Sequence, residues 1–201
     1  MSTKAENNII RENLLRVKKF LAQGDSSSAL KLLQKKPLSV LSSPRIFELK
    51  GDVLLKLKKY DEAISNYSKF TERSDDRLRG LLKIASVKRL MGKSSSAIRD
   101  YENLLSAYPK NVALVNSLGN AYKEMNETDQ ALDLYNRAIK LDKDHLGAHF
   151  NKGSILLNTG NISKAIESFE YVLNVEKNHF VSLKALGCLL YTSPSPRDAT
   201  L

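Results

Sequence analysis

The feature that most constrains this chain is a repetition, because the sequence resembles itself after a shift of 34 positions. At this shift, alanines fall into one column without a gap. The members of this column are Ala29, Ala63, Ala97, Ala131 and Ala165. A fixed period of this length indicates a stack of small units in which each unit buries its apolar face against the next. We therefore expect an array of repeats, which does not need a single globular core.

Other columns in the same register predict two helices joined by a tight turn in each unit. One column holds glycines that would let two helices approach closely, at positions 51, 119, 153 and 187. A second column suits a helix that ends in a left-handed residue, and its members are Gly24, Gly92, Asn126 and Gly160, with Lys58 as the exception. Three residues later, we expect N-caps at Ser27, Asp61, Ser95, Asp129 and Ser163. An aromatic column, formed by Tyr67, Tyr101, Tyr135 and Phe169, is expected to lie in the core.

The central copy, residues 112–145, carries the most complete pattern. Its members are Val115, Leu118, Gly119, Tyr122, Ala131, Tyr135 and Lys143. This pattern resembles the tetratricopeptide repeat, with Val115 in place of its Trp, Tyr135 in place of its Phe and Lys143 in place of its Pro. The resemblance implies an all-α fold, namely a right-handed α-solenoid of tandem helix-turn-helix repeats whose role is protein binding.

The register also predicts how the chain is divided. Residues 1–9 are expected to form a polar N-terminal arm. The array is expected over residues 10–187, with units at 10–43, 44–77, 78–111, 112–145 and 146–179 and a partial unit at 180–187. Residues 188–201 contain CLLYTSPSPRD, which resembles a translated sequencing adapter, and prolines arrive where the next helix belongs. We expect this tail to be non-native and the chain to be a fragment of a longer protein.

The net charge of +10 is unevenly distributed. Residues 1–111 hold 23 Lys and Arg against 12 Asp and Glu, whereas residues 112–201 hold 9 against 10. The chain opens without a long apolar run, so we expect neither a secretory signal nor a membrane span. We therefore expect a cytoplasmic location. The basic half is therefore the place to look for an acidic partner.

No constellation in the sequence indicates catalysis, a cofactor or a metal. One short run, Gly92-Lys93-Ser94, resembles the end of a phosphate-binding loop. That motif needs a glycine where Val87 stands. His145 and His149 are four residues apart, as metal ligands on a helix can be, but no Glu follows in the metalloprotease pattern. We therefore expect a protein that is not an enzyme.

The resemblance implies that the first helix of each unit lines a groove in which peptides or partner helices bind. The second residue of a unit would face this groove, which places Arg11, Arg45 and Arg79 in one basic row. Lys83 and Arg89 would extend the row. Guanidinium groups hold carboxylates through paired hydrogen bonds, so an acidic peptide is the expected ligand. The alternative is that this is only a solvated charged face.

Farther along, polar side chains would line the same groove at Asn116, Asn120, Lys123 and Asn151. An amide side chain offers both a donor and an acceptor, which suits binding to a peptide backbone. Asn120 and Asn151 match asparagines of the family's carboxylate clamp for chaperone tails. The cations of that clamp are missing, because Val181 and Ala185 stand at its final basic pair. Binding of chaperone tails is therefore not expected.

These observations favour a protein interaction scaffold that binds a partner peptide or helix. The alternative is the recognition arm of a larger enzyme, such as a transferase, whose catalytic domain lies outside this chain. Nucleic-acid binding ranks last, because the aromatic residues are committed to packing and only phosphate contacts would remain. The apolar face of residues 180–187 has no following helix to cover it, so self-association through this end is also expected.

Overall fold

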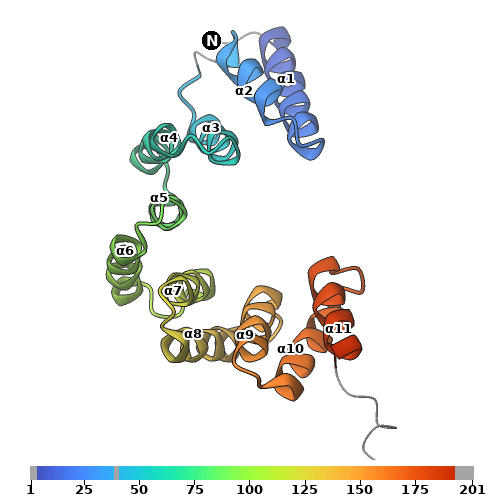
Figure 1. Cartoon of the computed structure of the whole chain (residues 1–201). Helices are drawn as coiled ribbons and strands as arrows, with labels where there is room; N and C mark the ends of the chain where they lie inside the picture. The colour runs from blue at the N-terminus through green and yellow to red at the C-terminus, as the bar shows by residue number, and fades with distance from the viewer. Residues whose placement is uncertain (1–3, 39–40, 193–201) are drawn as a thin grey trace, which may run out of the picture. The chain divides into compact units, whose positions relative to one another are not determined.

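The computed structural model describes residues 4–38 and 41–192, and within them all regular secondary structure is helical (Figure 1). The chain divides into two compact units, residues 1–97 and 98–201. The helices of the first unit are α1 (Lys4–Ala22), α2 (Ser26–Gln34), α3 (Pro44–Lys56), α4 (Tyr60–Arg73) and α5 (Arg77–Leu90). Helix α6 (Ser94–Ala107) crosses the boundary. The second unit continues with α7 (Val112–Glu124), α8 (Thr128–Leu141), α9 (Leu146–Asn158), α10 (Ile162–Val175) and α11 (Phe180–Thr192).

The helices follow the register of the repeat. Helices α3, α7, α9 and α11 begin at residues 44, 112, 146 and 180, the predicted first residues of their units. Within each unit of the structure, consecutive helices such as α3 and α4 or α7 and α8 pack against one another. The prediction of an all-α array of helix-turn-helix repeats is confirmed. None of the described helices is both long and apolar enough to cross a membrane.

The N-terminal end differs from the expectation of a polar arm over residues 1–9. Helix α1 already begins at Lys4, and residues 1–3 lie outside the described part. Ile10 and Leu14 pack against the buried cluster around Val17, which fixes α1 in place. Once a helix is held by such packing, adding residues at its end costs little, so the helix extends through residues 4–9.

The turn inside each unit is built on a left-handed residue. Gly24, Lys58, Gly92, Asn126 and Gly160 all have a positive φ, between 58° and 79°. The residue after each of them donates its N–H five positions back, as Lys59 does to the Leu54 carbonyl at 2.9 Å. This is the Schellman ending, which satisfies carbonyls that the helix leaves free. Lys58 therefore adopts the backbone conformation of the glycines in its column, although it carries a Cβ.

The predicted N-cap column is wrong by two residues. The helices that follow the turns begin at Ser26, Tyr60, Ser94, Thr128 and Ile162, so Asp61 and Asp129 lie inside the first turn. The Schellman turn leaves only one residue before the next helix, and this residue becomes the cap. Among the caps described at these turns, Asp25 accepts a hydrogen bond from the Ser28 N–H at 2.9 Å. Asp61 and Asp129 instead place a negative charge near the positive end of the helix dipole.

The two helices of a unit meet through a glycine and an aromatic ring. Tyr67, Tyr135 and Phe169 are at most 1% exposed, and the five alanines of the repeat are fully buried. A Cβ placed on Gly119 would lie 2.7 Å from a ring carbon of Tyr135, and one on Gly153 would lie 2.8 Å from the ring of Phe169. Gly51 has the same relation to Tyr67. The aromatic column is therefore core, as predicted.

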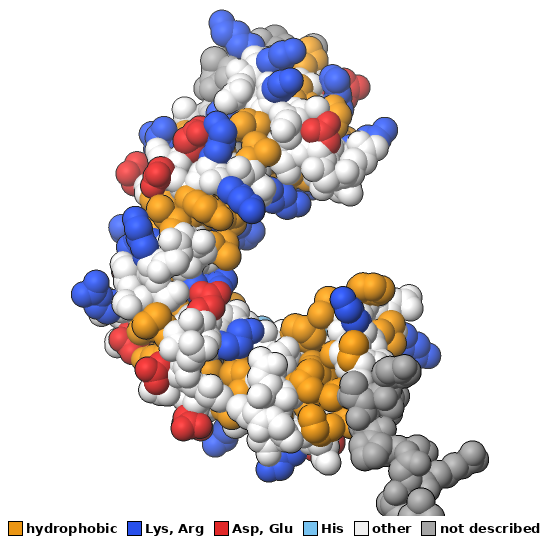
Figure 2. Space-filling model, viewed as in Figure 1, with side chains coloured by type: hydrophobic (Ala, Val, Ile, Leu, Met, Phe, Trp, Pro, Cys, Tyr) orange, Lys and Arg blue, Asp and Glu red, His pale blue; other side chains and the backbone are white. Residues whose placement is uncertain are grey.

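Helix α11 ends the described part of the second unit. It continues to Thr192, five residues past the predicted end of the array, while residues 193–201 of the predicted non-native tail lie outside the described residues. Hydrophobic side chains gather on the surface of the last helices (Figure 2), and Phe180, Val181 and Leu183 are exposed. Leu186 packs instead against the cluster around Phe169. The origin of residues 188–201 and self-association through α11 both stay predictions.

Replacing Lys58 with glycine should stabilise the protein. The left-handed conformation costs a residue with a Cβ about 1–2 kcal/mol, and the greater flexibility of glycine in the unfolded chain offsets part of this gain. We expect the free energy of unfolding in urea to rise by about 0.5–1 kcal/mol. The reciprocal change at the equivalent turn, Gly92→Lys, should lower it, and a loss of stability in Lys58→Gly would contradict this account of the turn.

Replacing Gly119 with alanine should destabilise the second unit, because the added methyl group overlaps the Tyr135 ring. Overpacking of this kind costs about 1–3 kcal/mol, which exceeds the gain of roughly 1 kcal/mol in helix propensity. Gly187→Ala is the matched control, since no atom lies within 4 Å of the position of its Cβ. Urea unfolding should show a loss only for Gly119→Ala. Equal effects of the two changes would show that the glycine contact does not hold the helices together.

Candidate functional site

The three arginines predicted to form a row lie on the first helices of the N-terminal unit. Arg11 is on α1, Arg45 on α3 and Arg79 on α5, and all three are exposed. Two hollows lie along this face. Arg11 and Arg45 line one hollow, and Arg45 and Arg79 line the other. The structure therefore brings the three residues, here called the arginine row, onto one continuous surface.

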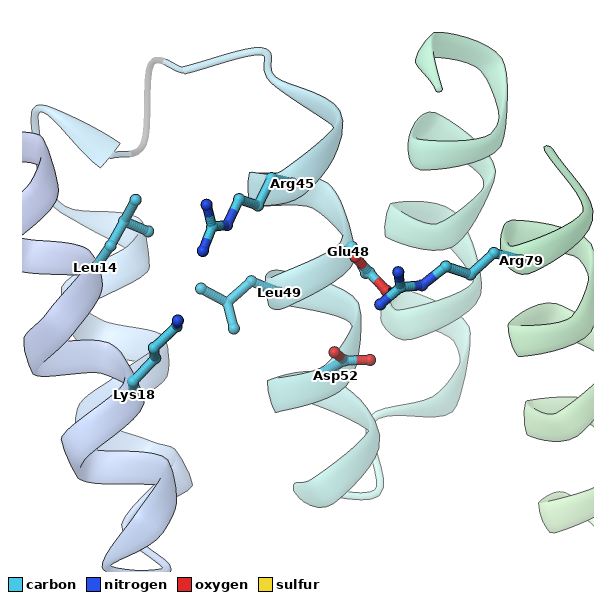
Figure 3. Close-up of a pocket in the computed structure, with 7 residues that line it drawn as sticks. All are labelled: Leu14, Lys18, Arg45, Glu48, Leu49, Asp52 and Arg79. Carbon is cyan, nitrogen blue, oxygen red and sulfur yellow. The ribbon is translucent and has the colours of Figure 1, made fainter. Parts of the chain in front are cut away.

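The hollow that contains Arg79 has a mixed lining. Its volume is about 110 Å³. We call it the mixed hollow, and its lining residues are Leu14, Lys18, Arg45, Glu48, Leu49, Asp52 and Arg79. Figure 3 shows Leu14 and Lys18 reaching from α1 toward Arg45 and Leu49 of α3, while Arg79 extends from α5 toward Glu48. Acidic and basic side chains thus share this part of the surface.

Glu48 and Asp52 neutralise much of the charge near α5. Arg79 Nε lies 2.7 Å from Glu48 Oε1. Lys83 Nζ lies 3.3 Å from the same Glu48 oxygen and 2.6 Å from Asp52 Oδ1. Glu48 is only 14% exposed, so its pairing is shielded from solvent more than an ordinary surface ion pair is. The basic row is therefore compensated at its α5 end.

The buried Tyr67 joins this network from below. Its hydroxyl donates a hydrogen bond to Asp52 Oδ1 at 2.7 Å. Burial raises the pKa of Tyr67, and the hydrogen bond to Asp52 raises it further, so the hydroxyl remains a donor. The Tyr67 hydroxyl and the Lys83 ammonium group together hold the Asp52 carboxylate in place.

Sequence reasoning missed Glu48 and Asp52, although a signal was present. They follow Arg45 by three and seven residues, a spacing that places side chains on one face of a helix. Counting the charge of the arginine row alone therefore overestimated how basic this face is.

Arg89, expected to extend the row, is in the last turn of α5. It is half-buried and is not among the residues that line the two hollows. The structure does not bring it together with Arg79 in either hollow. Ten residues of helix separate the two side chains, so they point in different directions around α5.

In the second unit, the predicted asparagines do meet. Asn151 Nδ2 on α9 donates to Asn116 Oδ1 on α7 at 3.2 Å. The Tyr135 hydroxyl donates to Asn120 Oδ1 at 2.8 Å. Lys123 lies in the last turn of α7, three residues after Asn120. The three asparagines are half-buried, and Asn116 and Asn120 lie one turn apart on α7, so we call the three together the amide cluster.

The amide cluster occupies the same positions as the charged network, two repeats later in the sequence. A shift of two repeat lengths takes Glu48 to Asn116, Asp52 to Asn120 and Lys83 to Asn151. The contacts are also of the same kind. Lys83 contacts Glu48 in the first unit, and Asn151 contacts Asn116 in the second. The Tyr67 hydroxyl donates to Asp52 in the first unit, and the Tyr135 hydroxyl donates to Asn120 in the second. One geometry is therefore built with charges in the first unit and with neutral amides in the second.

The histidines considered as metal ligands have other partners. His145 Nδ1 accepts a hydrogen bond from the Ala148 N–H at 3.0 Å and caps α9. His149 stacks on Tyr171 with ring centroids 3.9 Å apart, and its Nε2 lies 2.9 Å from the Lys143 carbonyl oxygen. Both rings therefore serve the packing of the second unit. Across residues 4–38 and 41–192, no group of three or more His, Cys, Asp and Glu could hold a metal ion.

Comparison with protein families gives matches over most of the array. Models described as tetratricopeptide repeat match residues 44–77, 146–179 and 79–111, and a model described as TPR repeat matches residues 119–160. The predicted units from 44 to 179 are thus all matched, at least in part.

The curated relatives are much longer than this chain. Tetratricopeptide repeat protein 8 of Caenorhabditis elegans is 27% identical over 135 residues, which cover 66% of this chain and 27% of the relative. Superkiller complex protein 3 of Mus musculus is 29% identical over 48% of this chain and 6% of its own length. RNA polymerase II-associated protein 3 of Xenopus laevis is 30% identical over 52% of this chain and 16% of its own length. The chain therefore spans about a quarter or less of these relatives.

Solved structures share the fold at low identity. The thermophilic TPR protein TTC0263 of Thermus thermophilus has a TM-score of 0.74 at 17% identity, covering 90% of this chain and 98% of that one. YrrB, described as a TPR protein with an unusual peptide-binding site, has a TM-score of 0.57 at 16% identity, with 92% and 100% covered. MamA of Desulfovibrio magneticus RS-1 has a TM-score of 0.58 at 18% identity, with 85% and 96% covered. These likenesses show the helical repeat fold.

Converting the charged network into the amide cluster should be tolerated better than removing its cation alone. Lys83→Asn leaves Glu48 and Asp52 without the ammonium group that both contact, so we expect a loss of about 1–2 kcal/mol in the free energy of unfolding. The triple change Glu48→Asn, Asp52→Asn and Lys83→Asn should cost less, because the chain already uses that arrangement at Asn116, Asn120 and Asn151. Urea unfolding measures both, and a triple variant less stable than Lys83→Asn would refute the equivalence.

Proposed function

Because the chain belongs to the tetratricopeptide repeat family, we propose that it is a protein interaction scaffold whose first-helix face binds a partner peptide or helix. The arginine row is the observation that carries this proposal. Three guanidinium groups from three successive first helices border two hollows that share Arg45. Arginine binds carboxylates through two parallel hydrogen bonds, so an acidic segment of the partner fits this face.

The pairing on this face refines the proposal. Arg79 and Lys83 already contact Glu48 and Asp52, so an incoming carboxylate would have to compete for them. Arg11 and Arg45 line a hollow with no acidic residue. The attraction for an acidic partner is therefore strongest between α1 and α3.

A second binding surface is proposed in the second unit, on the amide cluster. Asn116 and Asn120 use their side-chain oxygens within the protein, which leaves their NH₂ groups to donate, and Asn151 keeps its oxygen to accept. The position equivalent to Arg79 is Gly147, which has no side chain to cover the asparagines. A peptide backbone could approach here and bind through neutral hydrogen bonds that depend little on ionic strength.

Two other functions have less support. The relatives reported above carry the names of repeat, complex and associated proteins, so they do not favour a recognition arm of a transferase. This chain spans about a quarter or less of their length, so we do not transfer the activity of a whole relative to it. Nucleic-acid binding is disfavoured because Glu48 and Asp52 interrupt the basic surface and the aromatic column is buried.

Selection of random peptides displayed on phage would test the scaffold proposal. The full chain is expected to enrich acidic peptides, and their affinity should fall as the salt concentration rises. The triple variant Arg11→Ala, Arg45→Ala and Arg79→Ala should bind them about threefold or more weakly, since the partly exposed ion pairs of Arg11 and Arg45, at roughly 0.2–1 kcal/mol each, are removed, while Arg79 is already paired with Glu48.

The matched control removes three exposed cations of the same unit, Arg16, Lys31 and Lys56, which line neither of the two hollows described above. This variant should keep its affinity within about twofold. Unchanged affinity in the arginine variant, or failure to enrich any peptide, would count against the proposed function.

A further inference from the structure

The hollow between α1 and α3 combines cations with exposed apolar surface. Its volume is about 330 Å³, at the lower end of the range for ligand pockets, roughly 300–1,000 Å³. We call it the basic hollow, and it is lined by Ile10, Arg11, Leu14, Leu15, Lys18 and Arg45. Half of these residues are cations, half are aliphatic, and none is acidic.

The cations surround the aliphatic residues. Arg11 and Lys18 are seven residues apart on α1, which is two helical turns, so they lie above and below Leu14 and Leu15. Arg45 reaches across from α3 toward α1, and Figure 3 shows it facing Leu14, with Lys18 alongside. A ligand in this hollow would meet positive charge on three sides.

The aliphatic floor has one exposed member. Leu15 is 59% exposed, and the other lining residues of this hollow include three cations. Ile10 and Leu14 are half-buried and continue into the cluster around Val17. An apolar side chain placed here would remove Leu15 from water and rest on atoms already fixed by the core.

From this arrangement we infer that the basic hollow binds an acidic peptide segment that carries one large apolar residue. The apolar side chain enters between α1 and α3, and flanking carboxylates pair with Arg11, Lys18 and Arg45. The inference rests on the proposed scaffold function and names its ligand class and site. It also identifies Lys18 and Leu15 as binding residues outside the arginine row.

The neighbouring mixed hollow determines how charge should be distributed along the bound peptide. Arg45, Lys18 and Leu14 line both hollows, so a peptide that leaves the basic hollow toward α5 meets Glu48 and Asp52. A carboxylate placed there would be repelled by both acids while Arg79 and Lys83 remain paired with them. The segment is therefore acidic and apolar over α1 and α3, and neutral or basic where it passes α5.

A labelled synthetic peptide tests this inference on the full chain. The probe carries a leucine between glutamates in a glycine–serine chain, with a neutral fluorophore, and binding is followed by fluorescence anisotropy. Arg11→Gln, Lys18→Gln and Arg45→Gln together should weaken binding by about tenfold or more. Arg16→Gln is the matched control, because Arg16 is an exposed cation of α1 that does not line the basic hollow, and it should change binding by less than about twofold.

The contact between Leu15 and the apolar side chain of the peptide is tested separately. Leu15→Ser should weaken binding of the leucine probe by about threefold or more, and should have no effect on a probe with serine in place of leucine. Leu15 is exposed, so its replacement should leave the helical circular dichroism unchanged. Equal losses with both probes would overturn the inference.

Other outcomes separate the inference from the proposed function. If peptides selected on the full chain still bind the triple glutamine variant, the basic hollow is not their site, although the scaffold function stands. If Arg16→Gln weakens the probe as much as Lys18→Gln does, the binding is general electrostatic attraction and the inference fails. If duplex DNA or phosphatidylserine vesicles bind the full chain more tightly than the leucine probe does, and the triple glutamine variant loses that binding, the hollow belongs to a different class of partner and the inference fails.

Discussion

The close contact between a glycine on one helix and an aromatic ring on the next is the interaction on which the structure depends. Gly51 with Tyr67, Gly119 with Tyr135 and Gly153 with Phe169 each leave no room for a Cβ. The rings are buried, so each contact removes a large apolar surface from water and fixes how near the two helices lie. Because these contacts occupy the same place in their repeats, the helix pairs that contain them have the same internal spacing.

The same aromatic residue also connects the core with the proposed binding face. Tyr67 packs its ring on Gly51 and donates its hydroxyl to Asp52, the next residue of α3. Tyr135 does the same with Gly119 and Asn120 on α7. Phe169 has no hydroxyl, so the third helix pair of this kind keeps the packing without the polar link. A surface residue positioned in this way is held by the core, which reduces the entropy lost when a ligand binds to it.

The two units use this scaffold for different surfaces. In the first, Glu48, Asp52, Arg79 and Lys83 form ion pairs, and the cations of α1 and Arg45 stand beside them around an apolar floor. In the second, asparagines at the equivalent positions form hydrogen bonds without net charge. Coulomb attraction weakens with salt and amide hydrogen bonds depend on it little, so the two surfaces suit ligands of different chemistry.

The sequence by itself determined the helical class, the register of the repeats, and the buried alanines and aromatic residues, because each follows from a periodic pattern of residue types. It also put Arg11, Arg45 and Arg79 at equivalent positions of their repeats, and their role in binding is a proposal. It misplaced the N-caps by two residues, since only one residue lies between the left-handed residue of the Schellman turn and the next helix, and the residue types alone do not show this. Only the tertiary structure decided which cations are compensated. Glu48 pairs with Arg79 and Lys83 across α3 and α5, whereas Arg45 of α3 and Lys18 of α1 line a hollow that has no acidic residue. Whether a charge attracts a ligand depends on neighbours nearly a full repeat away in the sequence, and folding alone brings them within a few ångströms.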